Sequence, residues 1–148
     1  MTLYLQNSNA MESLGAQLFA CLPEKCTVFL RGDLGTGKTT LVRGFLTAAG
    51  HQGAVKSPTY TLVEEYEITG RHYYHFDLYR LTDPEELEWI GFQDYFNQDT
   101  VCFIEWPEKG VGFLPDADII IEIEADKNRR NVNFIKIAKK LLTILEKQ

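Results

Sequence analysis

A glycine-rich octapeptide at residues 32–39 constrains the fold of this chain more than any other feature. Its residues match the pattern G-x-x-x-x-G-K-[ST] at every fixed position. The apolar run 27–30 comes just before it and predicts a buried strand, while residues 39–49 predict a helix that Gly50 would end. Strand, glycine loop and helix in this order are the context that a phosphate-binding P-loop requires. The sequence therefore predicts a nucleotide-binding loop at this position.

The residue types of the octapeptide explain how it would bind phosphate. Glycines let the backbone turn so that successive N–H groups face one anion. The helix that begins near Lys38 adds the positive end of its dipole. The Lys38 ammonium would reach the β- and γ-phosphates, and the Thr39 hydroxyl would bind Mg²⁺.

Two acidic residues follow apolar strands and are candidates for a metal shell. Glu105 comes directly after the apolar run 101–104, which is the pattern of a Walker B element, and Asp77 follows the aromatic-rich run 73–76. Ligands collect at the carboxyl ends of strands in α/β sheets, so both carboxylates would lie near the P-loop. Mg²⁺ bound to phosphates usually takes one or two protein carboxylates as well. The alternative for either residue is a solvated carboxylate at a strand end.

The remaining patterns predict a P-loop NTPase-like α/β fold in one domain over residues 1–148. We expect a mainly parallel central sheet with flanking helices and antiparallel hairpin additions. Thr69-Gly70 is the turn of one hairpin, and Asp83-Pro84-Glu85-Glu86 is a strong helix start. Helices are expected over residues 10–22, 39–49, 84–96 and 138–147, and strands over residues 27–30, 60–68, 71–78, 101–104, 119–124 and 132–137.

Composition narrows the class of protein. The net charge of −6 argues against a free-standing nucleic-acid binder, because phosphate contacts need clustered Lys and Arg. No apolar run approaches the ~18 residues that span a bilayer, and residues 1–9 lack the basic start of a signal peptide. The three cysteines, Cys21, Cys26 and Cys102, give no disulfide framework and fit a reducing compartment. We therefore expect a cytoplasmic protein without a membrane partner.

Two histidines, His72 and His75, flank a pair of tyrosines in a predicted strand. Their spacing from the acidic residues does not support a zinc site. We expect these side chains to be packed or solvated.

The absence of characteristic motifs argues against several classes of P-loop protein. Neither the D-x-x-G nor the N-K-x-D motif of a GTPase occurs, and no LSGGQ-like transporter signature is present. A small-molecule kinase would need a lid with arginines, and the six arginines form no lid cluster. Two alternatives stay open, namely a small-molecule kinase that uses the same loop and a nucleotide-gated interaction protein without significant hydrolysis of its own.

Four further segments add to the P-loop, and within them Ser57-Pro58-Thr59 and His75-Phe76-Asp77-Leu78-Tyr79-Arg80 are far more specific than the P-loop itself. The four segments are Lys56-Ser57-Pro58-Thr59-Tyr60-Thr61-Leu62-Val63-Glu64, Tyr74-His75-Phe76-Asp77-Leu78-Tyr79-Arg80-Leu81, Asp83-Pro84-Glu85-Glu86-Leu87 and Ile104-Glu105-Trp106. Together with the P-loop they resemble the bacterial TsaE family of ATPases for tRNA threonylcarbamoyladenosine biosynthesis, also called YjeE. The likeness covers about residues 30–115, while the first 25 and last 30 residues match weakly. Met stands at position 11, where many relatives carry Thr.

The resemblance implies a protein that binds ATP with Mg²⁺ and hydrolyses it slowly without its partners. In that family the ATPase works with the TsaD and TsaB proteins, which transfer the threonylcarbamoyl group. The product is N6-threonylcarbamoyladenosine at position 37 of tRNAs that read codons starting with A. Contact with tRNA would belong to the partners, in agreement with the negative net charge.

The resemblance also implies roles for individual residues. Lys38, Asp77 and Glu105 would be the catalytic residues. Thr39 and Glu105 would position Mg²⁺, with Asp77 as a further metal-shell residue or as the group that orients the attacking water. The nucleotide phosphates would be held by Gly35, Thr36, Gly37, Lys38, Thr39 and Thr40.

Three other residues are expected near the nucleotide on the same basis. The loop Ser57-Pro58-Thr59 would act as a switch that senses the γ-phosphate through Thr59. Arg130 would approach the nucleotide from the last hairpin, and Trp106 would report on the nucleotide or contact a partner. No covalent intermediate is expected, because phosphoryl transfer needs mainly positioning and charge neutralisation.

Overall fold

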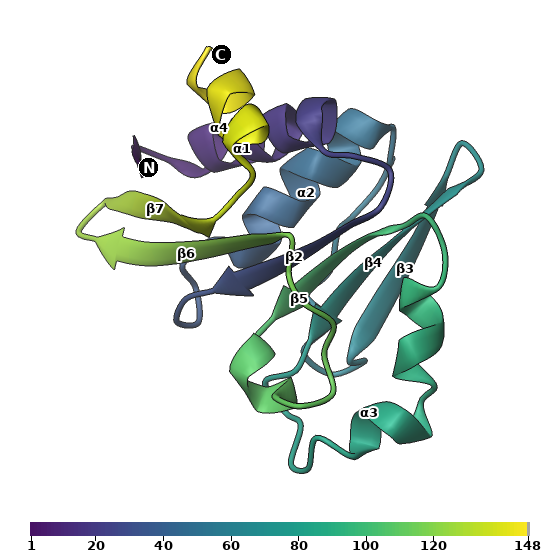
Figure 1. The fold of residues 1–148 in the computed structure, drawn as a ribbon. Coiled ribbons are helices and arrows are strands. Elements are labelled where there is room, and N and C mark those ends of the chain that lie inside the picture. Colours follow the sequence, from purple (N-terminus) through teal and green to yellow (C-terminus); the bar gives the residue numbers. More distant parts are fainter. Residues whose placement is uncertain (148) are drawn as a thin grey trace.

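The computed structural model describes residues 1–147, which form seven strands, four helices and two short 3-10 turns (Figure 1). The strands are β1 (Thr2–Leu5), β2 (Cys26–Arg31), β3 (Val63–Ile68), β4 (Arg71–Asp77), β5 (Val101–Glu105), β6 (Ile119–Asp126) and β7 (Arg129–Lys136). The helices are α1 (Ser8–Cys21), α2 (Lys38–Ala49), α3 (Glu86–Trp89) and α4 (Lys139–Glu146), with two 3-10 turns, η1 (Phe92–Phe96) and η2 (Pro107–Gly110).

The strands join one sheet in the order β1-β7-β6-β2-β5-β4-β3. At its centre β2 pairs in parallel with β5 and β6, and β4 pairs in parallel with β5. The outer pairs β3–β4, β6–β7 and β1–β7 are antiparallel. The predicted α/β class, with a parallel centre and hairpin additions, is confirmed, whereas the single-domain organisation stays a prediction.

The central strands are buried because helices cover both faces of the sheet (Figure 1). Helices α1, α2 and α4 cover one face, and α3 with the two 3-10 turns lies on the other. The first face packs the apolar side chains of α1 and α2 onto β2, β5, β6 and β7. The second holds a smaller core around Phe76, Phe92 and Ile104. Two cores on opposite faces hold the strand ends in fixed positions, and the site is built on those ends.

Helices α1 and α2 pack with their backbones in close approach at two glycines. A Cβ atom at Gly44 would lie 2.1 Å from the Glu12 carbonyl oxygen, and one at Gly15 would lie 2.2 Å from that of Leu41. Either distance is far below van der Waals contact, so both positions require glycine. This close packing fixes α2, and therefore the P-loop that precedes it, against α1.

Two predictions of secondary structure are wrong in detail. The helix expected over residues 84–96 is broken at Gly91, whose φ of +71° ends α3 before η1 begins. The sequence patterns do not predict strand β1, because Thr2–Leu5 is short and pairs only with β7, which lies far along the chain. Within residues 1–147 no helix has the length and apolar composition needed to cross a membrane.

Candidate functional site

The P-loop lies where the sequence predicts it, between the end of β2 and the start of α2. Gly32, Gly35 and Gly37 have φ values of +147°, +79° and +112°, which side-chain-bearing residues rarely adopt. Gly37 is the N-cap residue of α2 and makes no side-chain hydrogen bond. No cap side chain therefore accepts a hydrogen bond from the first N–H groups of the helix. A helix start of this kind offers its N–H groups and its dipole to an anion.

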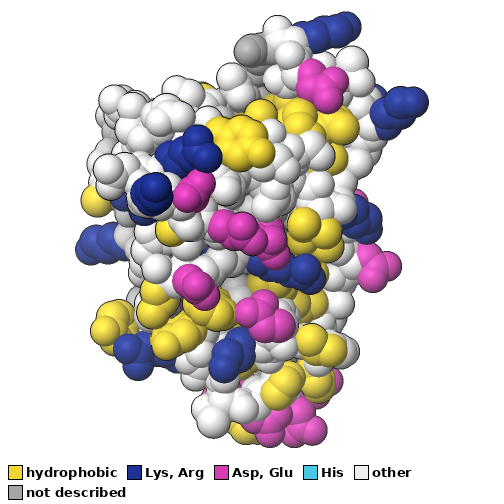
Figure 2. Space-filling view, turned by 90° about the vertical axis from the view of Figure 1, so that its left-hand side faces the viewer, with side chains coloured by type: hydrophobic (Ala, Val, Ile, Leu, Met, Phe, Trp, Pro, Cys, Tyr) yellow, Lys and Arg dark blue, Asp and Glu magenta, His cyan; other side chains and the backbone are white. Residues whose placement is uncertain are grey.

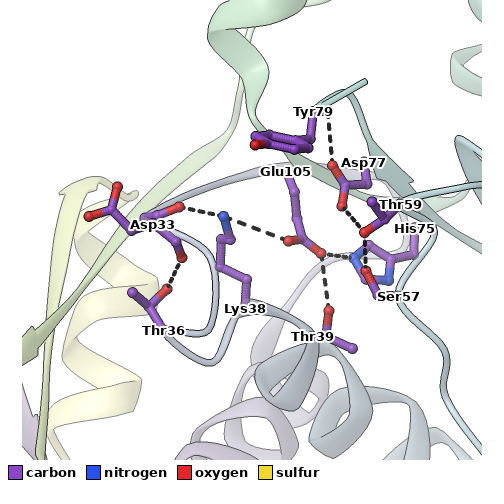
Figure 3. Close-up of polar contacts among 11 residues, drawn as sticks. Asp33, Thr36, Lys38, Thr39, Ser57, Thr59, His75, Asp77, Tyr79 and Glu105 are labelled. Carbon is purple, nitrogen blue, oxygen red and sulfur yellow. Dashed lines mark hydrogen bonds and ion pairs between the residues drawn. The ribbon is translucent and has the colours of Figure 1, made fainter. Parts of the chain in front are cut away.

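The Lys38 side chain is folded back across the loop and is 4% exposed. Its ammonium donates to the Gly32 carbonyl and lies 3.8 Å from Oε1 of Glu105 (Figure 3). It also stands 4.3 Å from the centroid of the Trp106 ring. Burial lowers the pKa of Lys38, and the nearby carboxylates of Glu105 and Asp77 oppose that shift. The cation is therefore held at the loop by a carbonyl oxygen, a carboxylate and an aromatic face.

Asp77 and Glu105 end two neighbouring parallel strands and are directly opposite each other in the register of β4 and β5. Both side chains are buried. Oε2 of Glu105 accepts hydrogen bonds from the Thr39 hydroxyl at 3.4 Å and from Nε2 of His75 at 2.5 Å (Figure 3). The predicted Walker B carboxylate thus contacts the hydroxyl that the P-loop places at the start of α2.

Asp77 is bonded to the loop that precedes β3. Oδ2 accepts from the Thr59 hydroxyl at 3.0 Å, and Oδ1 accepts from the Tyr79 backbone N–H at 2.9 Å. The Ser57 hydroxyl is 2.7 Å from that of Thr59. A chain of hydroxyls therefore leads from the predicted switch loop to the carboxylate (Figure 3).

Of the hollows that border the P-loop, two also reach the strand-end carboxylates or Arg130. One, of about 270 Å³, is lined by Leu34, Gly35, Gly37, Lys38, Thr39, Thr40, Ser57, Thr59, Asp77 and Glu105. The other, of about 290 Å³, is lined by Gln6, Asn7, Ser8, Met11, Gly35, Thr36, Gly37, Thr40, Asn128 and Arg130. Gly35, Gly37 and Thr40 line both hollows, so one ligand lying across the loop would reach from the carboxylates to Arg130.

Arg130 lies at the second hollow and not beside the carboxylates. Its Nε donates to the Thr36 carbonyl at 3.1 Å, which ties the β6–β7 hairpin to the P-loop. Met11 contributes to the same hollow from α1, in contact range of Gly37. The residues predicted to be catalytic or to bind the nucleotide or the metal therefore border one or the other hollow, whereas Trp106 borders a third hollow with Gly32 and Glu108. The chemical roles assigned to these residues stay predictions.

Known proteins share both the sequence and the fold of this chain. The model of the family described as Threonylcarbamoyl adenosine biosynthesis protein TsaE matches residues 5–132. The chain belongs to the TsaE family.

Curated relatives and a solved structure extend this match. The TsaE protein of Haemophilus influenzae is 64% identical over 108 residues, which are 73% of this chain and 68% of that protein. The TsaE protein of Aquifex aeolicus is 35% identical over 135 residues, 89% of this chain and 93% of that one. The crystal structure of YdiB from Bacillus subtilis aligns with a TM-score of 0.80 at 26% identity, over 99% of this chain and 92% of that chain. With its P-loop, this member of the TsaE family is therefore a P-loop NTPase-like protein.

The oxygen atoms at the first hollow suit Mg²⁺. The Thr39 hydroxyl and the carboxylates of Asp77 and Glu105 are hard oxygen donors, which Mg²⁺ prefers. Within residues 1–147 no group of three or more His, Cys, Asp and Glu side chains could hold a metal ion by itself. A Mg²⁺ ion that keeps several other oxygen ligands needs only one or two protein carboxylates, so the oxygen donors of this TsaE chain fit such an ion.

Sequence reasoning misses several residues of this TsaE site. Gln6 and Asn128 border the second hollow from two loops and Ser8 from the first residue of α1, and no motif marks them. His75, which the sequence predicts to be packed or solvated, is buried and bonded to Glu105. The alternation of side chains along a strand is the pattern in the sequence that points to a position of His75 near the site, because it places His75 on the same face of β4 as Asp77.

Proposed function

We propose that this chain is an ATP-binding, Mg²⁺-dependent ATPase. It would support formation of N6-threonylcarbamoyladenosine at position 37 of tRNAs that read codons starting with A. The observation that carries the proposal is the meeting of Lys38, Thr39, Asp77 and Glu105 at one hollow in a member of the TsaE family. A P-loop beside carboxylates at neighbouring strand ends suits phosphoryl transfer, which needs mainly positioning and stabilisation of charge. The cytoplasmic location predicted from the sequence stays a prediction.

The P-loop would bind the triphosphate through backbone N–H groups and the Lys38 ammonium. Lys38 would exchange its contacts with the Gly32 carbonyl and Glu105 for phosphate oxygens, which are stronger partners for a buried cation. Thr39 and Glu105 would hold Mg²⁺, and Mg²⁺ bound there would neutralise charge on the transferred phosphoryl group. Asp77 would complete the metal shell or accept a hydrogen bond from the attacking water.

The second hollow would take the nucleoside. Its lining combines the apolar Met11 side chain with polar groups from Gln6, Ser8 and Asn128, as small-molecule sites commonly do. Arg130 stands between this hollow and the loop, where its guanidinium would approach the sugar or the α-phosphate. The family likeness favours adenine as the base.

The TsaD and TsaB proteins are the proposed partners, and tRNA would be contacted through them. The net charge of −6 supports this division of roles. On the face shown in Figure 2, acidic side chains lie among the basic ones, and the described residues of this face form no continuous basic patch. A surface of this kind suits protein contacts better than a phosphate backbone.

Calorimetric titration with ATP and Mg²⁺ tests the binding part of the proposal. The wild-type protein should bind, and Lys38→Ala should abolish binding, because it removes the cation of the P-loop. Lys56→Ala, in the exposed loop nearby, is the matched control and should bind like the wild type. Normal affinity in the Lys38 variant would refute the assigned role of Lys38.

Phosphate release, measured with and without TsaD and TsaB, tests the enzymatic part. We expect slow release from the protein alone and faster release with the partners. Transfer of phosphate to an added metabolite would indicate a kinase instead. Binding of ATP without release under either condition would indicate a nucleotide-gated interaction protein.

A further inference from the structure

Within residues 1–147 the buried His75 side chain has one polar contact, and that contact is Glu105. The residue is 1% exposed, and its Nε2 lies 2.5 Å from Oε2 of the carboxylate. Nδ1 is buried without any hydrogen-bond partner among the described residues. Burying an imidazole costs free energy unless its polar atoms are satisfied, so a side chain that serves packing alone would be apolar here. The contact with Glu105 is what distinguishes His75 from a core residue.

The direction of this hydrogen bond follows from the surroundings of Glu105. Its Oε1 lies 3.8 Å from the Lys38 ammonium, and its Oε2 also receives the Thr39 hydroxyl at 3.4 Å. A carboxylate between these donors is an acceptor, so Nε2 of His75 carries the hydrogen and donates it. The imidazole and the P-loop therefore hold the carboxylate from two sides.

His75 holds Glu105 at the oxygen that faces Thr39. The β4–β5 register places His75 opposite Phe103, one side-chain pair behind Asp77 and Glu105 on the same face of the sheet. Neighbouring aromatic rings of Phe45, Tyr73 and Phe103 pack deeper in that face, so the position of the imidazole is determined by the core. A rigid donor behind a flexible carboxylate fixes the rotamer of that carboxylate.

We propose that His75 is a positioning residue that sets the affinity of the site for the nucleotide-bound divalent cation. The imidazole holds Glu105 in an orientation in which the free lone pairs of the carboxylate and the Thr39 hydroxyl oxygen both point to the position of the cation. The inference rests on the proposed function, since the cation is taken to arrive with ATP. His75 itself contacts neither the metal nor the phosphates.

Three variants separate positioning from packing. His75→Leu keeps the volume and removes the donor, while His75→Gln keeps an N–H donor near the place of Nε2. His72→Leu is the matched control, because His72 lies on the same strand and its ring bonds Glu65 at the surface. Each variant is first compared with the wild type by thermal unfolding and by its affinity for ADP without a divalent cation.

The decisive measurement is a titration of each ADP complex with Mn²⁺, followed by electron paramagnetic resonance of the free ion. His75→Leu should weaken Mn²⁺ binding by about 10- to 100-fold, the usual effect of losing an outer hydrogen bond to a metal ligand. Its affinity for ADP without the cation should stay within about twofold of the wild type, since the P-loop is unchanged. His75→Gln should recover most of the loss, and His72→Leu should show none.

Wild-type Mn²⁺ affinity in His75→Leu, or equal losses in a folded Leu and a folded Gln variant, would overturn the proposal. Nitrogen-15 spectra of the wild-type imidazole decide the point even if the variants unfold. The spectra should show hydrogen on Nε2, with a chemical shift that moves in Glu105→Gln, and hydrogen on Nδ1 alone would overturn the inference. Failure of the wild type to bind ADP would instead refute the proposed function and leave the spectral result to judge the His75–Glu105 bond.

Discussion

The Thr59 hydroxyl donates a hydrogen bond of 3.0 Å to Oδ2 of Asp77, and this bond ties the switch loop to the end of β4. The other carboxylate oxygen accepts the Tyr79 backbone N–H, so both oxygens of Asp77 are occupied. Leu62, three residues beyond Thr59, has a φ of +71°, which is costly for a residue with a side chain. The bond therefore fixes Thr59 beside the carboxylate, in a loop that contains one residue of unfavourable backbone conformation.

Thr59→Val should weaken binding of ATP more than binding of ADP. The substitution keeps the shape and removes the hydroxyl that is proposed to sense the γ-phosphate. Loss of one hydrogen bond to a charged group corresponds to about 1.5–3 kcal/mol, or roughly 10- to 100-fold in the dissociation constant for ATP. Calorimetric titration with both nucleotides in Mg²⁺ gives the two values.

Thr61→Val is the control for this prediction, because Thr61 is exposed and its hydroxyl bonds Glu64 and not Asp77. It should bind both nucleotides like the wild type. An equal loss for ATP and ADP in Thr59→Val would show that Thr59 supports the loop without sensing the γ-phosphate.

Asp77→Asn and Glu105→Gln should remove hydrolysis and spare the binding of nucleotide. Each change keeps the size of the side chain and removes a charge that would act on Mg²⁺ or on water. Loss of a single electrostatic group from a catalytic site typically lowers kcat by about 100- to 1000-fold. Phosphate release in the presence of TsaD and TsaB measures the rate, and titration with ADP in a chelator measures binding.

Glu64→Gln is the matched control for both carboxylates, since Glu64 belongs to the neighbouring strand and bonds an exposed threonine. Its rate should equal that of the wild type. A variant of Asp77 that hydrolyses ATP at the normal rate would remove that residue from the mechanism.

Local sequence patterns are sufficient to predict the P-loop and both carboxylates. The octapeptide is a run of consecutive residues, and the positions of Asp77 and Glu105 follow from the rule that strand ends gather at one edge. The register that places the two acids opposite each other is set by pairing between β4 and β5. It depends on contacts between segments that lie far apart in the chain, which no local pattern encodes.

The features that sequence reasoning misses all depend on long-range packing. Strand β1 is stabilised by pairing with β7, and its residues alternate between exposed and half-buried without a turn signal beside them. His75 has a role only because Glu105 arrives next to it from another strand. A glycine such as Gly91 can also occur inside a helix, so the sequence alone does not show that the helix ends there. The packing of Phe76 against Phe92 and Phe96 favours the break at this position.

Gly44→Ala should destabilise the fold, although a glycine-to-alanine change inside a helix normally stabilises by about 1 kcal/mol. The added Cβ would lie 2.1 Å from the Glu12 carbonyl oxygen, so α1 must shift away from α2. Forcing extra volume into a packed interface costs about 1–3 kcal/mol or more. Urea unfolding gives the difference, with Thr47→Ala at an exposed position of α2 as a control that should not destabilise. Equal or higher stability of Gly44→Ala would contradict the close helix contact.

The buried thiols should make the stability of the fold decline at alkaline pH. Burial, aided by the Asp118 carboxylate, raises the pKa of the Cys26 thiol from 9.0 to about 12, and burial raises that of Cys102 to about 11. In the unfolded chain both thiols ionise near 9, whereas in the folded chain they stay neutral. The free energy of unfolding therefore falls as pH rises above about 9 and keeps falling until the folded thiols ionise as well.

Thiol labelling provides the direct measurement of this protection. The thiolate is the reactive form, so iodoacetamide at a pH of about 8.5 should modify Cys21 first, since it is only half-buried, although burial raises its pKa too. Cys26 and Cys102 should react only under unfolding conditions, where all three label at similar rates. Mass spectrometry of peptides after timed quenching gives the rate at each site. Rapid labelling of Cys26 in the folded protein, with Cys21 still free, would show that β2 opens at its first residue and would contradict the packed core at that end of the sheet.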